Sequence, residues 1–460
     1  MTGLETSVVE AATGKRAEPL TRSIPVFDTS SDTYQRFGLL ALTEMAARQG
    51  GDAVLLRLAG GHNALLLSGA DGADHYARHV ADIPGERGDV TSNAAAVRRL
   101  LGDSDLAEAW RRGRLSIDEH LPLWLERARA RATTALLHDA LRPQGSDRLR
   151  VLCRLWSVRA CCPALLGHGL ADPDLIEGFL RIEAFFTALN GVGPQVDGAE
   201  AEEAFKQARA FVDDVLAAGL MRGSSGDDNA VCALRALLPS SCSTKNMIDE
   251  LRPVIFGLLF EAIQIDGLNL LWTLVELARG GALVEAIAME GRTDDAVRAG
   301  PLARAVTMEA LRLYPELPFI HPTGPASNVD DEGLRGEAIL YAPWLIHRDA
   351  RLWPEPTRFL PQRFLSGAEK ARLPDIYMPF GLGPLARKRT QFVIDQIAAT
   401  VTTICRNACL SLAPDCRPGD LRPVYRATLQ PRGDVDVHWQ RRPNGDAAPH
   451  APLETEKSDG

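Results

Sequence analysis

The sequence predicts a mainly α-helical protein with a minor β region. Apolar residues recur at helical spacing through most of the chain, and the segment 253–278 is apolar on nearly every side. Runs typical of strands are short and lie within residues 53–68 and 425–439. Aromatic residues make up only 6% of the chain while Ala, Leu and Arg are abundant, which also favours helix.

Length and composition limit the domain organisation. The 460 residues exceed one average domain, but no repeat or low-complexity linker divides them. We therefore expect a single domain over residues 23–440, between a flexible N-terminus (1–22) and a disordered tail (441–460). The net charge of −9 argues against nucleic acid as a partner of the whole molecule. Without a signal-peptide core or a long apolar run, we expect a cytoplasmic protein with no membrane span.

Glycines and turn residues delimit the N-terminal elements. Helical spacing over residues 32–49 predicts a helix, which a Gly-Gly pair ends. The apolar runs 53–59 and 64–68 flank a Gly-Gly-His-Asn turn, a pattern that predicts a β-hairpin. A second helix is expected over residues 72–80.

Residues 94–290 are predicted to be almost entirely helical. Further on, an amphipathic helix is expected over residues 391–407, and two short strands, near 425–430 and 434–439, are expected to close the domain. Eight cysteines show neither a Cys-x-x-Cys pair nor a zinc spacing. We therefore expect reduced thiols and no dedicated metal site.

Polar residues form a stripe along the apolar segment 253–278. Asp266, Asn269, Thr273 and Glu276 fall at i, i+3, i+7 and i+10, which is one face of a helix. Polar groups on a buried helix need partners, water or a ligand. One interpretation is a satisfied seam against a neighbouring helix. The other makes these four residues candidate catalytic groups in a cavity, with Asp266 and Glu276 able to hold a cation.

A Gly-rich loop runs into a helix near residue 380, and three cations lie at the junction. Arg387, Lys388 and Arg389 follow the segment Phe380-Gly-Leu-Gly. Cations at such a junction are candidate contacts for an anion.

The loop resembles the heme-binding signature of the cytochrome P-450 superfamily, Phe-Gly-x-Gly-x-Arg-x-Cys-x-Gly. Phe380, Gly381 and Gly383 match it, whereas Leu385 stands at the Arg, Arg387 at the Cys and Arg389 at the last Gly. Two further motifs carry the resemblance: Glu309-Ala-Leu-Arg312 resembles the family's Glu-x-x-Arg helix, and Pro361-Gln-Arg363-Phe364 resembles its Pro-Glu-Arg-Phe.

The resemblance covers roughly residues 30–440 and implies a fold. This is the triangular, helix-rich cytochrome P-450 fold with a long central helix and small β-sheets. In that fold Glu309, Arg312 and Arg363 would form a structural triad, because two guanidinium forks can share one carboxylate. Such a triad is architectural and therefore says nothing of catalysis.

The same resemblance implies that oxygen-activating chemistry is missing. A cysteine thiolate pushes electron density onto heme iron, and a guanidinium at position 387 has no lone pair to replace it. On the central helix Gln264 and Ile265 occupy the positions of the family's acid and threonine. His321 lies where the family often has an Arg that binds a heme propionate, so the resemblance makes it a further candidate contact for an anion. We therefore expect a heme-less homologue that is not a working monooxygenase and binds no cofactor, except that Mg²⁺ would suit diphosphate chemistry.

Three functions follow from the resemblance, all expected in bacterial-type natural-product metabolism. The first is a non-redox enzyme of cyclase, lyase or isomerase type, acting on a hydrophobic substrate such as an isoprenoid diphosphate. The second is an auxiliary protein that binds and activates a partner such as a glycosyltransferase, as some heme-less relatives of the family do. The third is an oxidoreductase with residual heme binding.

Overall fold

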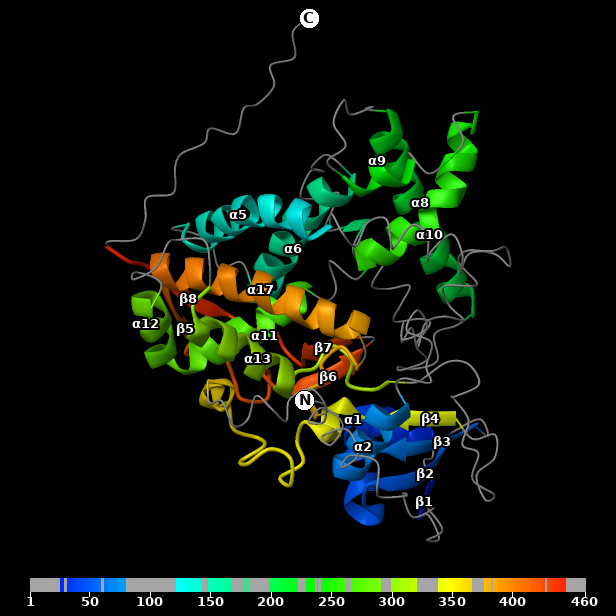
Figure 1. The fold of residues 1–460 in the computed structure, drawn as a ribbon, viewed down its shortest axis with the longest axis vertical. Coiled ribbons are helices and arrows are strands. Elements are labelled where there is room, and N and C mark those ends of the chain that lie inside the picture. The colour runs from blue at the N-terminus through cyan, green and yellow to red at the C-terminus, as the bar shows by residue number, and fades with distance from the viewer. Residues whose placement is uncertain are drawn as a thin grey trace, which may run out of the picture.

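The computed structural model is mainly helical with small sheets, so the predicted fold class is confirmed (Figure 1). It describes residues 25–28, 31–58, 62–79, 121–142, 148–166, 177–178, 180–181, 198–221, 229–235, 238, 241–260, 266–290, 299–320, 338–365, 376–382, 384–426 and 428–443.

The N-terminal sheet contains the predicted hairpin. Helix α1 (Ser31–Gly50) precedes β2 (Ala53–Leu58) and β3 (His62–Leu67), which pair antiparallel, and α2 (Gly69–His79) follows. Parallel strands lie on either side of the hairpin: β1 (Val26–Asp28) beside β2, and β4 (Ala338–Tyr341) beside β3. The sheet therefore joins the start of the chain to a strand from its last third.

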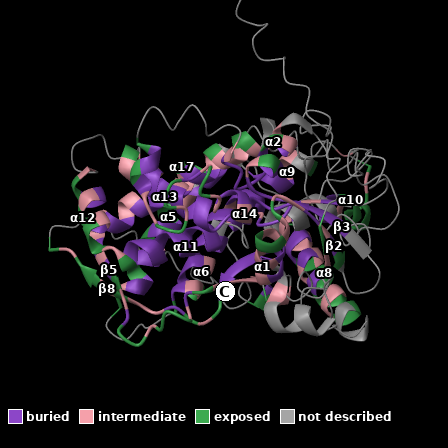
Figure 2. Cartoon of the chain, turned by 90° about the horizontal axis from the view of Figure 1, so that it is seen from below, coloured by how far each residue is buried: buried purple, intermediate pink, exposed green. Residues whose placement is uncertain are grey.

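Four helices form the centre of the helical part. These are α5 (Leu121–Ala140), α6 (Leu149–Leu166), α11 (Asp266–Arg279) and α17 (Pro384–Asn407). Figure 2 shows the buried residues concentrated along them. Polar contacts join three of the helices: Trp156 donates to Thr133 Oγ1 (3.1 Å), which lies 3.4 Å from Thr400 Oγ1. The main apolar core lies between these helices because each presents an apolar stripe to its neighbours.

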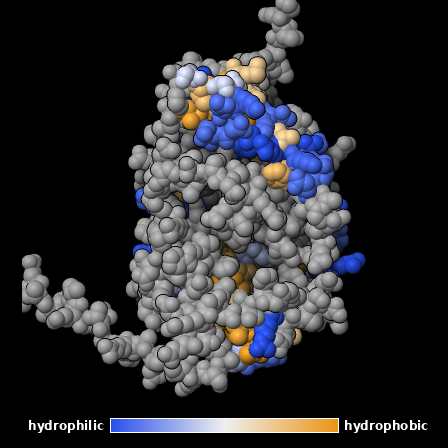
Figure 3. Space-filling model, turned by 90° about the vertical axis from the view of Figure 1, so that its right-hand side faces the viewer, coloured by the Kyte–Doolittle hydropathy of each residue, from blue (hydrophilic) through white to orange (hydrophobic). Residues whose placement is uncertain are grey.

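A second apolar cluster lies under three helices at one end of the molecule. They are α8 (Gly198–Met221), α9 (Ala230–Arg235) and α10 (Thr244–Phe260), and Trp124 of α5 packs with them. Arg252 of α10 binds both Asp213 and Asp249. The described side chains at this end are mostly hydrophilic on the face shown in Figure 3.

The remaining described elements surround the centre of the helical part. They are the helices α12 (Gly281–Glu290), α13 (Pro301–Leu313) and α14 (Pro343–Ile346), the 3₁₀ turn η3 (Pro361–Phe364), and two antiparallel strand pairs, β5 (Ala408–Leu412) with β8 (Val437–Arg441) and β6 (Pro423–Arg426) with β7 (Thr428–Pro431). None of the helices in the described part is long and apolar enough to cross a membrane.

Two predicted helices differ from the observed ones. The segment 253–278 falls on α10 and α11, and residues 261–265 between them lie outside the described residues. Helix α17 begins at Pro384 rather than at residue 391. Proline suits the first turn of a helix, and the Leu-Ala-Arg-Lys-Arg run that follows has high helix propensity.

Candidate functional site

The buried ion network around Glu309 is the best-defined polar site in the described structure. Arg312 Nε and Nη2 donate to the two carboxylate oxygens at 2.7 and 2.9 Å, and Arg363 Nε donates to Oε1 at 3.1 Å. The Leu360 N–H also donates to the Glu309 carboxylate (2.8 Å). Glu309 and Arg312 are fully buried, so the network joins α13 to η3 inside the core.

Arg312 also binds the loops around it through backbone carbonyls. Its Nη1 donates to His347 O (2.6 Å) and Pro356 O (2.8 Å), and its Nη2 donates to Arg358 O (3.2 Å). The ring of Trp353 lies under the same guanidinium, 5.3 Å from Cζ. A single buried side chain therefore fixes the path of the segment that follows α14.

His347 connects this network to the Gly-rich loop. Its Nε2 accepts the Met378 N–H at 3.0 Å, so its Nδ1 carries the proton and donates to Arg312 O at 3.0 Å. The ring is fully buried and stacks on Tyr377. Burial, with the charge of Arg312 second, lowers the pKa of His347 from the ordinary 6.5 to about 3. The imidazole is therefore neutral at neutral pH, as both hydrogen bonds require.

The Gly-rich loop is also fixed from α2. Tyr76 Oη accepts the Leu382 N–H at 3.4 Å, and its ring lies against Tyr341 of β4 with the centroids 4.5 Å apart. Burial raises the pKa of Tyr76 to about 12. Gly381 has φ +86°, and a Cβ there would lie 3.0 Å from the Tyr76 hydroxyl. A glycine is required at this point for both reasons.

The three cations after the loop differ in their surroundings. Arg387 and Lys388 are exposed on the first turns of α17, whereas Arg389 is half-buried. Arg389 Nη2 lies 3.2 Å from Glu316 Oε1, and its Cζ lies 5.4 Å from the centre of the Phe380 ring. The first turns of α17 therefore present two exposed cations beside a third that is already paired.

The polar stripe on α11 is largely satisfied within the protein. The Glu276 carboxylate accepts from Tyr314 Oη and from Arg279 Nη1, both at 2.6 Å, and Thr273 donates to Asn269 O at 2.7 Å. Burial raises the pKa of Glu276, although Arg279 and Tyr314 oppose the shift. Among the described residues, Asn269 Nδ2 is a buried donor without a hydrogen-bond partner. The contacts of Glu276 are those expected of a satisfied polar seam. Among the described residues of this stripe, Asn269 is the remaining candidate for contacting a ligand.

Several predicted site residues lie outside the described structure. His321, Gln264 and Ile265 belong to segments that are not described, and the side chain of Asp266 is likewise not described. Their roles stay predictions. Among the described residues, no group of three or more His, Cys, Asp or Glu side chains is placed to hold a metal ion.

Sequence reasoning missed the contacts made by His347, Tyr76 and Glu316. Each lies far from the loop in the sequence, and none belongs to the Phe-Gly-x-Gly motif. The one available signal was the His347-Arg348-Asp349 run, which lies between the two arginine-containing motifs of the triad.

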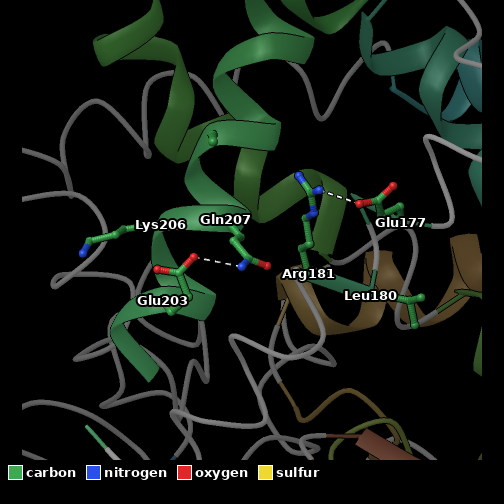
Figure 4. A pocket seen from close by; sticks show the side chains of 7 residues that line it. Glu177, Leu180, Arg181, Glu203, Lys206 and Gln207 are labelled. Atoms are coloured by element: carbon green, nitrogen blue, oxygen red, sulfur yellow. Dashed lines mark hydrogen bonds and ion pairs between the residues drawn. The ribbon is translucent and has the colours of Figure 1, made fainter. Parts of the chain in front are cut away.

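A surface hollow of about 730 Å³ lies between α8 and a segment that contains Glu177, Leu180 and Arg181 (Figure 4). Two pairs of polar side chains line it: Arg181 donates to Glu177 at 2.5 Å and Gln207 donates to Glu203 at 2.9 Å. None of the predicted site residues lines this hollow.

A family model described as Cytochrome P450 matches residues 202–386. Rice cytochrome P450 76M5 (Oryza sativa subsp. japonica) is 27% identical over 255 residues, which are 49% of this chain and 50% of that protein. The (+)-menthofuran synthase of Mentha piperita is 30% identical over 178 residues, 35% of this chain and 36% of the enzyme. The chain thus matches about half or less of the length of these relatives.

Solved structures extend the similarity to almost the whole fold. The retinoic acid-bound cyanobacterial CYP120A1 has a TM-score of 0.69 and 18% identity, covering 91% of this chain and 100% of that one. A zebra fish cytochrome P450 with abiraterone has a TM-score of 0.66 and 19% identity, covering 88% and 99%. At these identities the likeness establishes the fold.

The expectation that no cofactor is bound is wrong, because the family that this chain matches binds heme. The matched model and the solved structures are those of cytochromes P450, a heme-binding family. The loop of this chain, however, does not fit thiolate ligation, because an exposed arginine on the first turns of α17 occupies the position of the cysteine. The disagreement concerns the residue that would hold the heme iron and not the fold.

Heme added to the purified protein is expected to lack the thiolate signature. The reduced, CO-bound Soret band should not show the shift typical of a thiolate ligand, since the loop supplies no cysteine. Arg387→Cys is the matched variant and is expected to gain that shift. A thiolate-type band in the unaltered protein would contradict the prediction. It would mean that one of the eight native cysteines reaches the iron.

Proposed function

Because the chain belongs to the cytochrome P450 superfamily, we propose that it uses the family's fold as a scaffold for docking a partner protein. The docking surface is the cationic turn at the start of α17, formed by Arg387 and Lys388. The partner is an enzyme of the same biosynthetic pathway, of the glycosyltransferase class, with an acidic surface.

One observation carries the proposal: two exposed cations lie on the first turns of α17, directly after a loop that is fixed from the protein core. The loop is bound by His347 and Tyr76 on its inner side, while Arg387 and Lys388 face solvent. Exposed charges of one sign on a rigid element attract and orient an oppositely charged protein. The whole chain carries a net charge of −9, so an acidic partner would be attracted to this turn and not to the molecule as a whole.

The alternative of a non-redox enzyme has less support from the described residues. Its candidate acid, Glu276, is held by Tyr314 and Arg279, and its candidate hydroxyl, Thr273, is bonded to the helix backbone. Catalysis by Glu276 would require it to exchange those partners for substrate. Isoprenoid diphosphate chemistry therefore stays a prediction, with Asn269 as its remaining described contact.

Removing both exposed cations is expected to weaken docking strongly. In Arg387→Ala/Lys388→Ala the dissociation constant for the pathway's glycosyltransferase should rise about ten-fold or more, because two interfacial charges are lost. Isothermal titration calorimetry at two salt concentrations measures this change. The difference from the unaltered protein should shrink at high salt, where surface charges are screened.

Lys206→Ala/Lys245→Ala provides the matched control. It removes the same number of exposed positive charges from α8 and α10. Equal weakening by the two double variants would contradict a docking surface on α17. Full glycosyltransferase activity in the absence of this chain would contradict an auxiliary role.

A further inference from the structure

Two consecutive residues after α13 hold the two ends of the Gly-rich loop. The Leu317 N–H donates to Pro379 O at 3.1 Å, before the glycines. The Glu316 carboxylate binds Arg389 Nη2 at 3.2 Å, on the helix after them. These two residues therefore connect the segment after α13 to both ends of the loop.

The Glu316–Arg389 pair lies largely out of solvent. The side chain of Glu316 is 8% exposed and that of Arg389 is 22% exposed. Arg389 also covers the ring of Phe380, so one guanidinium contacts both the start of the loop and the segment after α13. Partial burial strengthens an ion pair relative to one in water, and makes its loss more costly.

The middle of the loop has its own contact with α2. Leu382 is bonded to Tyr76, and Gly381 packs against the same hydroxyl. Arg387 and Lys388 therefore lie between a bonded residue, Leu382, and a paired one, Arg389. Their backbone positions are restrained from both sides.

We propose that the ion pair between Glu316 and Arg389, called the latch below, holds the cationic turn in a fixed position. The two residues act through the loop, since Arg387 and Lys388 would meet the partner. In the resemblance to the family's motif, Arg389 stands at a glycine, so the latch belongs to this chain's own residues. The role in positioning rests on the proposed docking function, whereas the latch itself does not.

Hydrogen exchange on the full chain tests the latch directly. Glu316→Gln and Arg389→Met are each expected to speed exchange at the Leu317 and Leu382 amides roughly ten-fold, because the loop opens more often. The effects of the two substitutions should be less than additive in the double variant, because both remove the Glu316–Arg389 pair, while Arg389→Met also removes the contact with the Phe380 ring. Unchanged exchange, or effects that add in the double variant, would overturn the latch.

An exposed ion pair serves as the matched control. Glu355→Gln and Arg358→Met remove the exposed i, i+3 pair on the segment before η3. Exchange at Leu317 and Leu382 should not change in these variants, because that pair does not contact the loop. Faster exchange in them would mean that the loop amides report general loosening and not the latch.

The affinity for the glycosyltransferase distinguishes a positioning effect of Glu316 from a simple effect of its charge. Glu316→Gln removes a negative charge near the cations, so a simple charge effect would tighten binding of an acidic partner. Positioning predicts the opposite, a loss of roughly five-fold or more in affinity as the cations lose their fixed orientation. Tighter binding would overturn the positioning role even where exchange shows the latch. Absence of binding by the unaltered chain would instead reject the docking function.

Discussion

Replacing Glu309 by Gln is expected to destabilise the protein by about 3–5 kcal/mol, the range typical of breaking a buried ion pair. The substitution keeps the shape of the side chain but removes the charge that two buried guanidinium groups share. Arg312 is fully buried, and its remaining acceptors are neutral backbone carbonyls. Denaturant unfolding, followed by circular dichroism, measures the loss.

The exposed pair Arg358–Glu355 gives the comparison for this experiment. Glu355→Gln removes a carboxylate that also binds an arginine, but both side chains are more than half exposed. Its expected cost is within about 1 kcal/mol, because surface ion pairs contribute little. Similar losses in Glu309→Gln and Glu355→Gln would mean that the buried network is not the main support of this region.

Acidification is expected to destabilise the protein through His347. The pKa of His347 is about 3 in the folded chain against 6.5 ordinarily, so between these values the unfolded chain binds a proton that the folded chain does not. The stabilisation is therefore fully present above pH 6.5 and is lost as the pH falls towards 3. The slope from this one group is about 1.4 kcal/mol per pH unit, and the whole loss is roughly 4–5 kcal/mol.

His347→Gln isolates this contribution. The amide can still donate and accept hydrogen bonds but does not titrate in this range. The free energy of unfolding of the variant should fall less steeply with acidification than that of the unaltered protein. Parallel curves for the two proteins between pH 6.5 and 3 would contradict the assignment to His347.

Much of the fold could be predicted because it depends on local patterns. Gly50 and Gly51 end α1, and the turn between the runs 53–59 and 64–68 gives the β2–β3 hairpin. The start of α17 was predicted too late, because the motif emphasised a loop where Pro384 and the residues after it already favour helix. At this boundary, local helix propensity predicts the start of the helix better than the family resemblance does.

The candidate site could be predicted only in part, because its contacts join distant segments. Glu309, Arg312 and Arg363 meet as the resemblance implied, since motif and geometry coincide there. The partner of Arg389 could not be found, because spacing along one helix says nothing of a carboxylate on another segment. The cofactor expectation failed for a different reason: one substituted ligand was taken to decide a property that belongs to the whole family.

The pairing of β3 with β4 sets an order in which the domain can be completed. The parallel partner of β3 arrives only after most of the helices have been synthesised. Until then the edge of β3 offers unpaired backbone groups, and such an edge is a template for pairing with other chains. Closing a loop of this length is also slow compared with helix formation. We therefore expect the β3 edge of a nascent chain to be open to pairing with other chains until β4 has been synthesised.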